Sequence, residues 1–375
     1  MKLSKYKLGN CVELYSERCN IPNLTEWDVS GVNRDKEFFE PSKQVGENTS
    51  NYKVVPVDYF ACNLMHVGRD KVLPIAMNHT NKEKYVSPAY TVFKIKENAQ
   101  ILKEYFFIML KSNEQDRYFW FHTDSSIRDG MSWEDFCDLE ISFPPLVIQQ
   151  KYVAVYNAML ANQQSYERGL EDLKLTCDAY IDKLKHKRTL VEIGDFIQQI
   201  NNKNIDNQKY RFAGLSMDNY FIDSIADDTE LDFTKYKIVE PNEYGAVLMK
   251  VGRDARLTIA RNISNERYLI SPAYYTFRIT GIMPEYFMAC VNRPEFERRG
   301  WFSCDTSARG SLSWGEFMKL KIPNATDEEQ SIISELYKVQ VIRIGINEKL
   351  KEQIKHICPV LIKGSIEEAG KRRRP

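Results

Sequence analysis

One stretch of this 375-residue sequence occurs twice. Residues 64–93 read LMHVGRDKVLPIAMNHTNKEKYVSPAYTVF, and residues 248–277 read LMKVGRDARLTIARNISNERYLISPAYYTF. The two segments are identical at 16 of 30 aligned positions, whereas ordinary composition gives about two matches by chance. The offset of 184 residues is far too long for a solenoid repeat. The sequence therefore predicts two similar domains and a function that uses two of something.

A second pair of segments, residues 120–136 and 301–317, is identical at 8 of 17 positions. Each precedes a strand-like run that ends in proline. In the first repeat, Ser-Pro-Ala-Tyr favours an extended chain, because proline disfavours the helical conformation in its predecessor. Short apolar helices are expected to begin at Glu104 and Glu285. Each copy is therefore expected to be an α+β domain.

Each copy is followed by a segment typical of a long helix. Residues 149–186 lack proline and contain only one glycine, and their apolar residues recur at spacings of three and four, which is a heptad pattern. After the second copy, Thr326 and Glu329 form a capping-box pattern, and a similar seam continues to Pro359, where we expect the helix to end. The predicted helix-pairing residues are Leu170, Leu173, Cys177, Leu184, Leu336, Val339, Ile346 and Leu350.

The predicted order is a first domain (1–145), a long helix (146–190), a second domain (191–324), a long helix (325–362) and a basic tail (363–375). Two such seams in one chain most simply pack on each other. If the helices pair as an antiparallel coiled coil, the domains lie at opposite ends and are related by a pseudo-twofold axis.

Composition is typical of folded domains, with 43% apolar and 12% aromatic residues. The N-terminus has no apolar core for a signal peptide, and no apolar run is long enough to span a membrane. The eight cysteines are scattered, which indicates reduced thiols in a cytoplasmic protein.

Motifs for catalysis are missing from the sequence. It has no G-x-G loop, no GK[ST] phosphate loop, no HExxH and no His/Cys cluster at metal spacing. The five histidines do not recur between the copies, although a histidine needed by both copies should recur. We therefore expect no catalytic residue, no metal site and no cofactor in this chain.

Local charge points to nucleic acid. The first copy has a net charge of −3 and residues 191–322 have −1, yet residues 69–84 carry +2 and residues 250–267 carry +3. Such segments are candidate phosphate and base contacts. The candidates are Arg69, Lys71, Asn78, Asn81, Lys82, Lys84, Tyr90 and Arg128 in the first copy, and Arg253, Arg256, Arg261, Asn262, Asn265, Arg267, Tyr274 and Arg309 in the second.

These candidates also have structural interpretations: solvated loops, an Arg–Asp pair that fixes a loop, and core positions for the tyrosines. Features that both copies share should serve the fold, phosphate positioning or partner docking. Residues that read different ligands should lie where the copies differ within a common frame. Residues 77–84 and 261–268 are such segments.

The layout resembles the specificity (S) subunit of type I restriction-modification enzymes, the HsdS family. Two half-similar domains alternate with two long helices, and Pro-Pro-Leu-x-x-Gln-Gln (144–150) leads into the first helix, while the second copy keeps Pro323 and Gln330. The resemblance implies that each domain is a target recognition domain for one half of a bipartite, asymmetric site on double-stranded DNA. It implies that the helices set the gap and dock two methyltransferase subunits, which bind S-adenosylmethionine, and that a motor-nuclease subunit joins for cleavage.

Two alternatives stay open from the sequence. The chain could be the recognition part of a split methyltransferase-nuclease, or a scaffold whose duplicated domains bind protein or glycan. The slightly acidic domains favour the scaffold, and the missing catalytic motifs count against the split enzyme.

Overall fold

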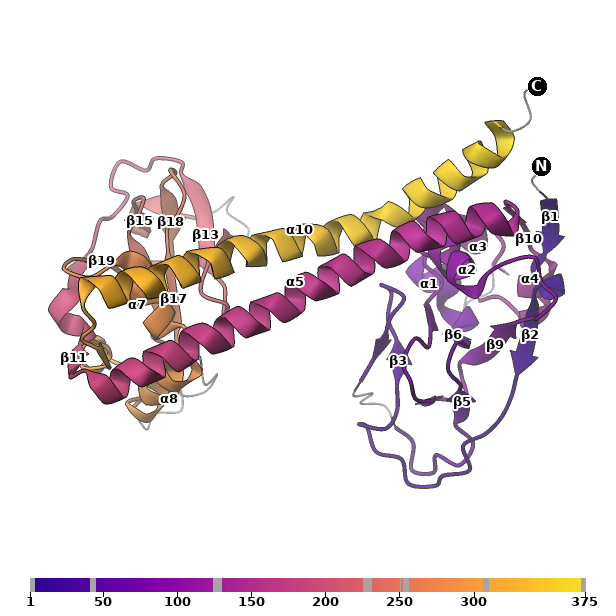
Figure 1. Ribbon diagram of the computed structural model, residues 1–375, viewed down its shortest axis with the longest axis horizontal. Helices are drawn as coiled ribbons and strands as arrows, with labels where there is room; N and C mark the ends of the chain where they lie inside the picture. Colours follow the sequence, from indigo (N-terminus) through magenta and orange to yellow (C-terminus); the bar gives the residue numbers. More distant parts are fainter. Residues whose placement is uncertain are drawn as a thin grey trace. The chain divides into compact units, whose positions relative to one another are not determined.

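The computed structural model describes residues 4–40, 45–123, 130–224, 231–249, 251, 256–305 and 310–371. The chain divides into two compact units, residues 1–165 with 348–375, and residues 166–347. Each unit therefore contains one globular domain and one half of each of the two long helices α5 (Leu146–Lys187) and α10 (Asp327–Lys371) (Figure 1).

The same four-stranded antiparallel sheet forms in both units. In the first unit the order is β2 (Val12–Tyr15), β9 (Thr91–Ile95), β6 (Phe60–Cys62) and β7 (Ile75–Met77). In the second unit it is β12 (Ile197–Ile200), β19 (Tyr275–Ile279), β16 (Tyr244–Val247) and β17 (Thr258–Arg261). Equivalent strands occupy equivalent places, so the duplication seen in the sequence is also a duplication of strand pairing.

Shorter strands complete each domain. In the first unit β1 (Ser4–Lys7) pairs with β10 (Glu140–Phe143), β3 (Gly31–Val32) with β4 (Phe38–Phe39), and β5 (Lys53–Val55) with β8 (Lys84–Val86). In the second, β11 (Leu190–Glu192) pairs with β20 (Lys321–Pro323), and a second sheet has the order β14 (Phe221–Asp223), β13 (Arg211–Leu215), β18 (Tyr268–Ile270) and β15 (Lys237–Val239). The short helical turns are η1 (Leu8–Asn10), η2 (Leu64–His66), α1 (Val67–Asp70), η3 (Ile193–Phe196) and η4 (Phe233–Lys235).

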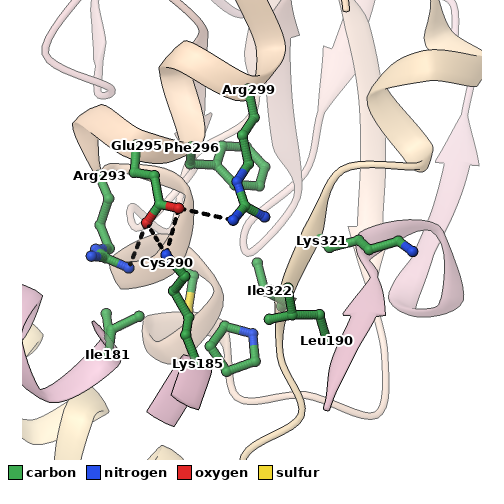
Figure 2. A pocket seen from close by; sticks show the side chains of 11 residues that line it. Ile181, Lys185, Leu190, Cys290, Arg293, Glu295, Phe296, Arg299, Lys321 and Ile322 are labelled. Atoms are coloured by element: carbon green, nitrogen blue, oxygen red, sulfur yellow. Dashed lines mark hydrogen bonds and ion pairs between the residues drawn. The ribbon is translucent and has the colours of Figure 1, made fainter. Parts of the chain in front are cut away.

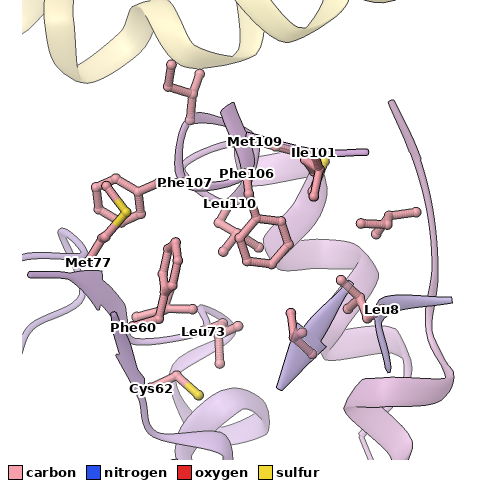
Figure 3. Close-up of a cluster of buried hydrophobic side chains, with 14 of the residues drawn as sticks. Leu8, Phe60, Cys62, Leu73, Met77, Ile101, Phe106, Phe107, Met109 and Leu110 are labelled. Carbon is pink, nitrogen blue, oxygen red and sulfur yellow. The ribbon is translucent and has the colours of Figure 1, made fainter. Parts of the chain in front are cut away.

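In the described residues, three short helices follow each main sheet. They are α2 (Lys103–Leu110), α3 (Asn113–Phe121) and α4 (Trp133–Asp138) in the first unit, and α7 (Pro284–Val291), α8 (Pro294–Phe302) and α9 (Trp314–Met318) in the second. The expected helices near Glu104 and Glu285 are confirmed. All residues from Tyr105 to Leu110 are buried, because α2 lies between the sheet and the long helices. Figure 3 shows Phe106 and Leu110 with Phe60 of β6 in this core.

The two long helices run antiparallel within each unit. In the first unit Lys151, near the start of α5, lies 2.7 Å from Glu368, near the end of α10. In the second unit Arg188, just after α5, lies 3.0 Å from Glu329 in the first turn of α10. The prediction of two long, antiparallel helices is confirmed. The prediction that Pro359 ends the second helix is wrong, since α10 continues through it to Lys371. Cys358 and Leu361 on either side are buried in the first core, and this packing stabilises the helix across the proline.

The predicted helix seam is only partly right. Cys177 and Leu184 are buried, but in the core of the second domain, and Leu170, Leu173, Leu336 and Leu350 are half-buried. Val339 and Ile346 are exposed, by 41% and 36%, so their predicted role in helix pairing is wrong. The buried stripe of α10 instead contains Ile333 and Asn347. α10 packs on a domain as well as on a second helix, and both neighbours decide which of its residues are buried. A strict heptad pattern describes only the helix pair and does not predict which residues face the domain.

A buried glutamine joins each long helix to its domain. The Gln149 side-chain amide donates to the carbonyls of Pro144 (2.7 Å) and Gln100 (2.9 Å), and its Oε1 accepts from the Leu102 N–H (2.8 Å). Gln330 repeats this arrangement, accepting from the Met283 N–H at 2.9 Å and donating to the Ala325 carbonyl at 3.0 Å. Each glutamine accepts from a backbone N–H at the start of α2 or α7, where a helix provides no acceptor for its first N–H groups. This shared role explains why both copies contain the glutamine.

The junction at Glu329 makes the second unit sensitive to acid. Hydrogen bonds from Arg188 and from the Thr326 N–H lower the pKa of Glu329 from 4.5 to about 2. Because the unfolded chain binds this proton more readily, the stabilisation is present above pH 4.5 and is lost as the pH falls towards about 2. We expect Glu329→Gln to lower the Tm of the second unit at pH 7 and to flatten its pH dependence in that window. Thermal melts of this variant and of Glu328→Gln, an exposed neighbour, measure this; equal pH profiles would contradict the assignment.

Candidate nucleic-acid interface

The two segments singled out by the sequence form loops with one shared frame. Asn78 directly follows β7, its equivalent Asn262 directly follows β17, and both side chains are completely buried. The Asn78 amide donates to the carbonyls of Val55 and Lys82, both at 2.9 Å, while its Oδ1 accepts from the Thr80 N–H and hydroxyl. Asn262 makes the same four contacts, to Val239, Glu266 and Ser264. The two loops are therefore held in the same way.

The exposed residues on this frame differ between the domains. The first loop exposes His79, Asn81, Lys82 and Glu83, and the second exposes Ile263, Asn265, Glu266 and Arg267. Asn81 and Asn265 are equivalent and identical, whereas Lys82-Glu83 and Glu266-Arg267 reverse the order of charge. Amide and cationic side chains are the groups that pair with base edges. Two loops with one frame and different tips can therefore recognise different partners with one geometry.

Four candidates do not have the predicted exposure: Asn78, Asn262, Arg261 and Lys84. Asn78 and Asn262 form the frame and lie beneath the surface, so their burial contradicts a base contact. Arg261 is largely buried, and its guanidinium donates to Glu285 at 2.7 Å and to Asn242 at 2.8 Å. A largely buried guanidinium paired in this way contributes to folding, and a sequence pattern cannot distinguish it from a surface cation.

Other cations are also paired, and Arg256 and Arg267 are accessible. Lys84 lies 2.7 Å from Glu40 and its side chain is only 15% exposed. Arg256 lies 3.3 Å from Glu297 and its side chain is 51% exposed. Arg267 donates to Glu240 at 2.9 Å and to the Tyr210 hydroxyl at 3.1 Å. The exposed pairs of Arg256 and Arg267 are weak and can exchange a carboxylate for a phosphate.

The two tyrosines take the structural role. Tyr90 is half-buried and its hydroxyl accepts from the Val32 N–H at 3.1 Å. The Lys53 amino group donates to its carbonyl, and in the second domain Lys237 does the same for Tyr274. Trp133 and Trp314 likewise pack against the domain cores.

Lys71 is exposed, with its amino group 4.9 Å from the centre of the Trp120 ring. Arg69 lies in α1, but its side chain is outside the described part of the structure, as are Arg128, Arg253 and Arg309 in full.

A cluster of charges that the sequence did not single out joins α8 to α5. Arg293 is 7% exposed and donates to Asp178 at 3.2 Å and Asp182 at 2.5 Å, both on α5. Glu295 accepts from Lys185 and Arg299 around a cavity of about 20 Å³ (Figure 2). That volume holds about one water, so the cluster is an anchor for the domain and not a ligand site.

The described residues contain no group of three or more His, Cys, Asp or Glu side chains placed to bind a metal ion. All eight cysteines are free thiols. In the same described part of the chain, none of the helices has the length and apolar character needed to cross a membrane.

No protein-family model and no curated protein matches this sequence. Among solved structures, the S subunit of a type I restriction-modification system from M. genitalium matches with a TM-score of 0.54 at 11% identity, covering 97% of this chain and 96% of that chain. The HsdS subunit from Thermoanaerobacter tengcongensis matches with a TM-score of 0.40 at 12% identity, covering 97% and 96%. A chain from a structure of complex assembly and conformational transition in the type I R-M system matches with a TM-score of 0.45 at 12% identity, covering 98% and 97%.

At these identities the similarity concerns the fold, and the M. genitalium structure supports it. The match covers both domains and both long helices, as the resemblance in layout predicts. This chain has the fold of the S subunit of a type I restriction-modification system.

Proposed function

We propose that this chain is the specificity subunit of a type I restriction-modification complex, and that each globular domain reads one half of a bipartite, asymmetric DNA site. The observation that carries the proposal is the pair of loops built on Asn78 and Asn262. An identical frame with different exposed residues is what two related readers of different half-sites require. The candidate base contacts are Asn81 and Lys82 in one loop, and Asn265 and Arg267 in the other.

Local geometry also explains how slightly acidic domains could bind DNA. Lys71 and Arg256 are accessible cations on the same domains as the loops. Phosphate contacts position a protein on the duplex, while base contacts select the sequence. A partner that also contacts the duplex would supply the remaining positive charge.

An exposed apolar face on α10 supports docking of a partner through the long helices. Ile332, Val339, Ile342 and Ile346 are between 36% and 62% exposed, and three of them recur every seven residues. Such a stripe is suited to packing against a further helix. We propose that methyltransferase subunits dock on the long helices, two per chain, that they bind the S-adenosylmethionine, and that a motor-nuclease subunit joins the same complex.

The adenine-methylation map of the source genome tests the function. With the gene disrupted, we expect methylation to disappear at one bipartite, asymmetric motif and to return when the gene is restored. The physical reason is that a methyltransferase without its specificity subunit loses the contacts that select its DNA site. An unchanged map, together with a purified chain that binds no methyltransferase, would contradict the proposal and favour a scaffold role.

A further inference from the structure

The helices α3 and α8 are equivalent, and they have diverged in an unusual way. Four of their nine positions are identical: Glu114 and Glu295, Arg117 and Arg298, Trp120 and Trp301, Phe121 and Phe302. The arginines, tryptophans and phenylalanines of this set are all exposed. Phe121 is 83% and Phe302 79% exposed, and the adjacent tryptophans are 39% and 45% exposed.

The buried positions of the same helices differ. Phe119 is fully buried in the first domain, but its equivalent is Gly300, where Leu257 and Leu312 approach the space of a side chain. Asp116 corresponds to Glu297, and the half-buried Gln115 corresponds to the buried Phe296. In diverging copies of one fold, packing normally constrains the interior more than the surface. The fold therefore does not explain why the outer face has stayed the same, and a shared external contact does.

The chemistry of this face suits a protein better than DNA. Tryptophan and arginine are enriched at the energetic centres of protein interfaces, and exposed aromatic rings gain most when a pocket desolvates them. The neighbouring charges do not form a phosphate site, because Glu114 pairs with Arg117, and Glu295 pairs with Lys185 and Arg299. The cation beside Trp120, Lys71, has alanine as its equivalent, so what the two faces share is a pair of exposed aromatic rings and one arginine.

We infer that the ends of α3 and α8 are two copies of one docking site, defined by Arg117, Trp120 and Phe121 and by Arg298, Trp301 and Phe302, for a protein partner with an apolar pocket. One partner molecule binds each domain, since the face is the same while the loop tips differ. Identification of that partner as the methyltransferase rests on the proposed function. These faces are distinct from the exposed stripe of α10.

The test uses the full chain and the purified methyltransferase subunit from the same source. Phe121→Ala and Phe302→Ala each remove a ring that is almost fully exposed, so folding is retained. We expect each variant to weaken one of two binding events at least tenfold by calorimetry, and the double variant to weaken both. Native mass spectrometry should show the loss of one methyltransferase per single variant. Trp27→Ala, which removes another exposed aromatic ring, should leave both events unchanged.

Three outcomes overturn the inference in different ways. Equal methyltransferase binding by the wild type and the double variant, with DNA affinity also equal, means that the face docks nothing. Equal methyltransferase binding with weaker DNA binding of the assembled complex means that the face contacts DNA. A wild-type chain that binds no methyltransferase removes this partner and contradicts the proposed function, which the first two outcomes leave intact.

Discussion

Replacing Asp116 with asparagine is expected to destabilise the first unit by about 3–5 kcal/mol, the cost of leaving a buried charge without its partner. The Lys36 amino group donates to Asp116 Oδ1 at 2.6 Å and to the Leu110 carbonyl at 2.5 Å. The Lys36 and Asp116 side chains are only 5% and 8% exposed. Burial lowers the pKa of Lys36, and the opposing effect of Asp116 only partly offsets this. Removing these two charges from water therefore costs free energy, which their mutual attraction has to offset. Asp116 also accepts a hydrogen bond from the Leu73 N–H at 3.1 Å. An asparagine at this position still accepts that hydrogen bond, so the substitution removes only the negative charge.

The equivalent carboxylate of the second unit is a matched control. Glu297 pairs with Arg256, whose side chain is 51% exposed, so Glu297→Gln leaves a cation that water can solvate, and we expect a loss of no more than about 1 kcal/mol. The double variant Lys36→Met with Asp116→Asn should recover most of the lost stability, because no charge then stays buried.

Hydrogen exchange in urea measures the two units separately. Exchange of the α2 amides reports on the first unit and exchange of the α7 amides on the second, since a chain of two units need not unfold in one step. A similar small loss in Asp116→Asn and Glu297→Gln would show that Lys36 is not dependent on its partner.

Exchanging the loop tips is expected to change one half of the DNA site and leave the other half as it is. In this variant His79–Glu83 (HTNKE) is replaced by the sequence of 263–267 (ISNER). The buried Asn78 frame accepts the new loop, because the second domain holds that loop with the same contacts. Each specific base contact contributes about 1–3 kcal/mol of discrimination, so methylation of the original motif should fall by one or more orders of magnitude.

Methylation mapping of cells that express the exchanged chain measures this change. Thr80→Ser, which reproduces only the frame residue of the second loop, should leave the motif and its occupancy unchanged. An original motif that stays fully methylated in the loop exchange would place sequence reading outside residues 79–83.

The sequence determined the large-scale organisation of this protein. Duplicated segments, each followed by a glycine- and proline-poor heptad region, predicted two α+β domains and two long helices. Both features depend on local propensity and on periodicity, which are properties of the sequence itself. The glutamines at 149 and 330 were visible in the resemblance, and the structure adds their hydrogen bonds to the starts of α2 and α7.

Only the tertiary structure decided which side chains face the solvent. Val339 and Ile333 are both apolar residues of one helix, and the domain beneath it decides that Ile333 is the buried one. Asn78, Asn262 and Arg261 are residue types that commonly contact DNA. In the structure they are buried or largely buried, and the two asparagines bind backbone groups while Arg261 binds Glu285 and Asn242. The outer faces of α3 and α8 also required the structure, because identity between the copies becomes informative only where the side chains are known to be exposed. Burial depends on residues far apart in the sequence, and no local pattern contains it.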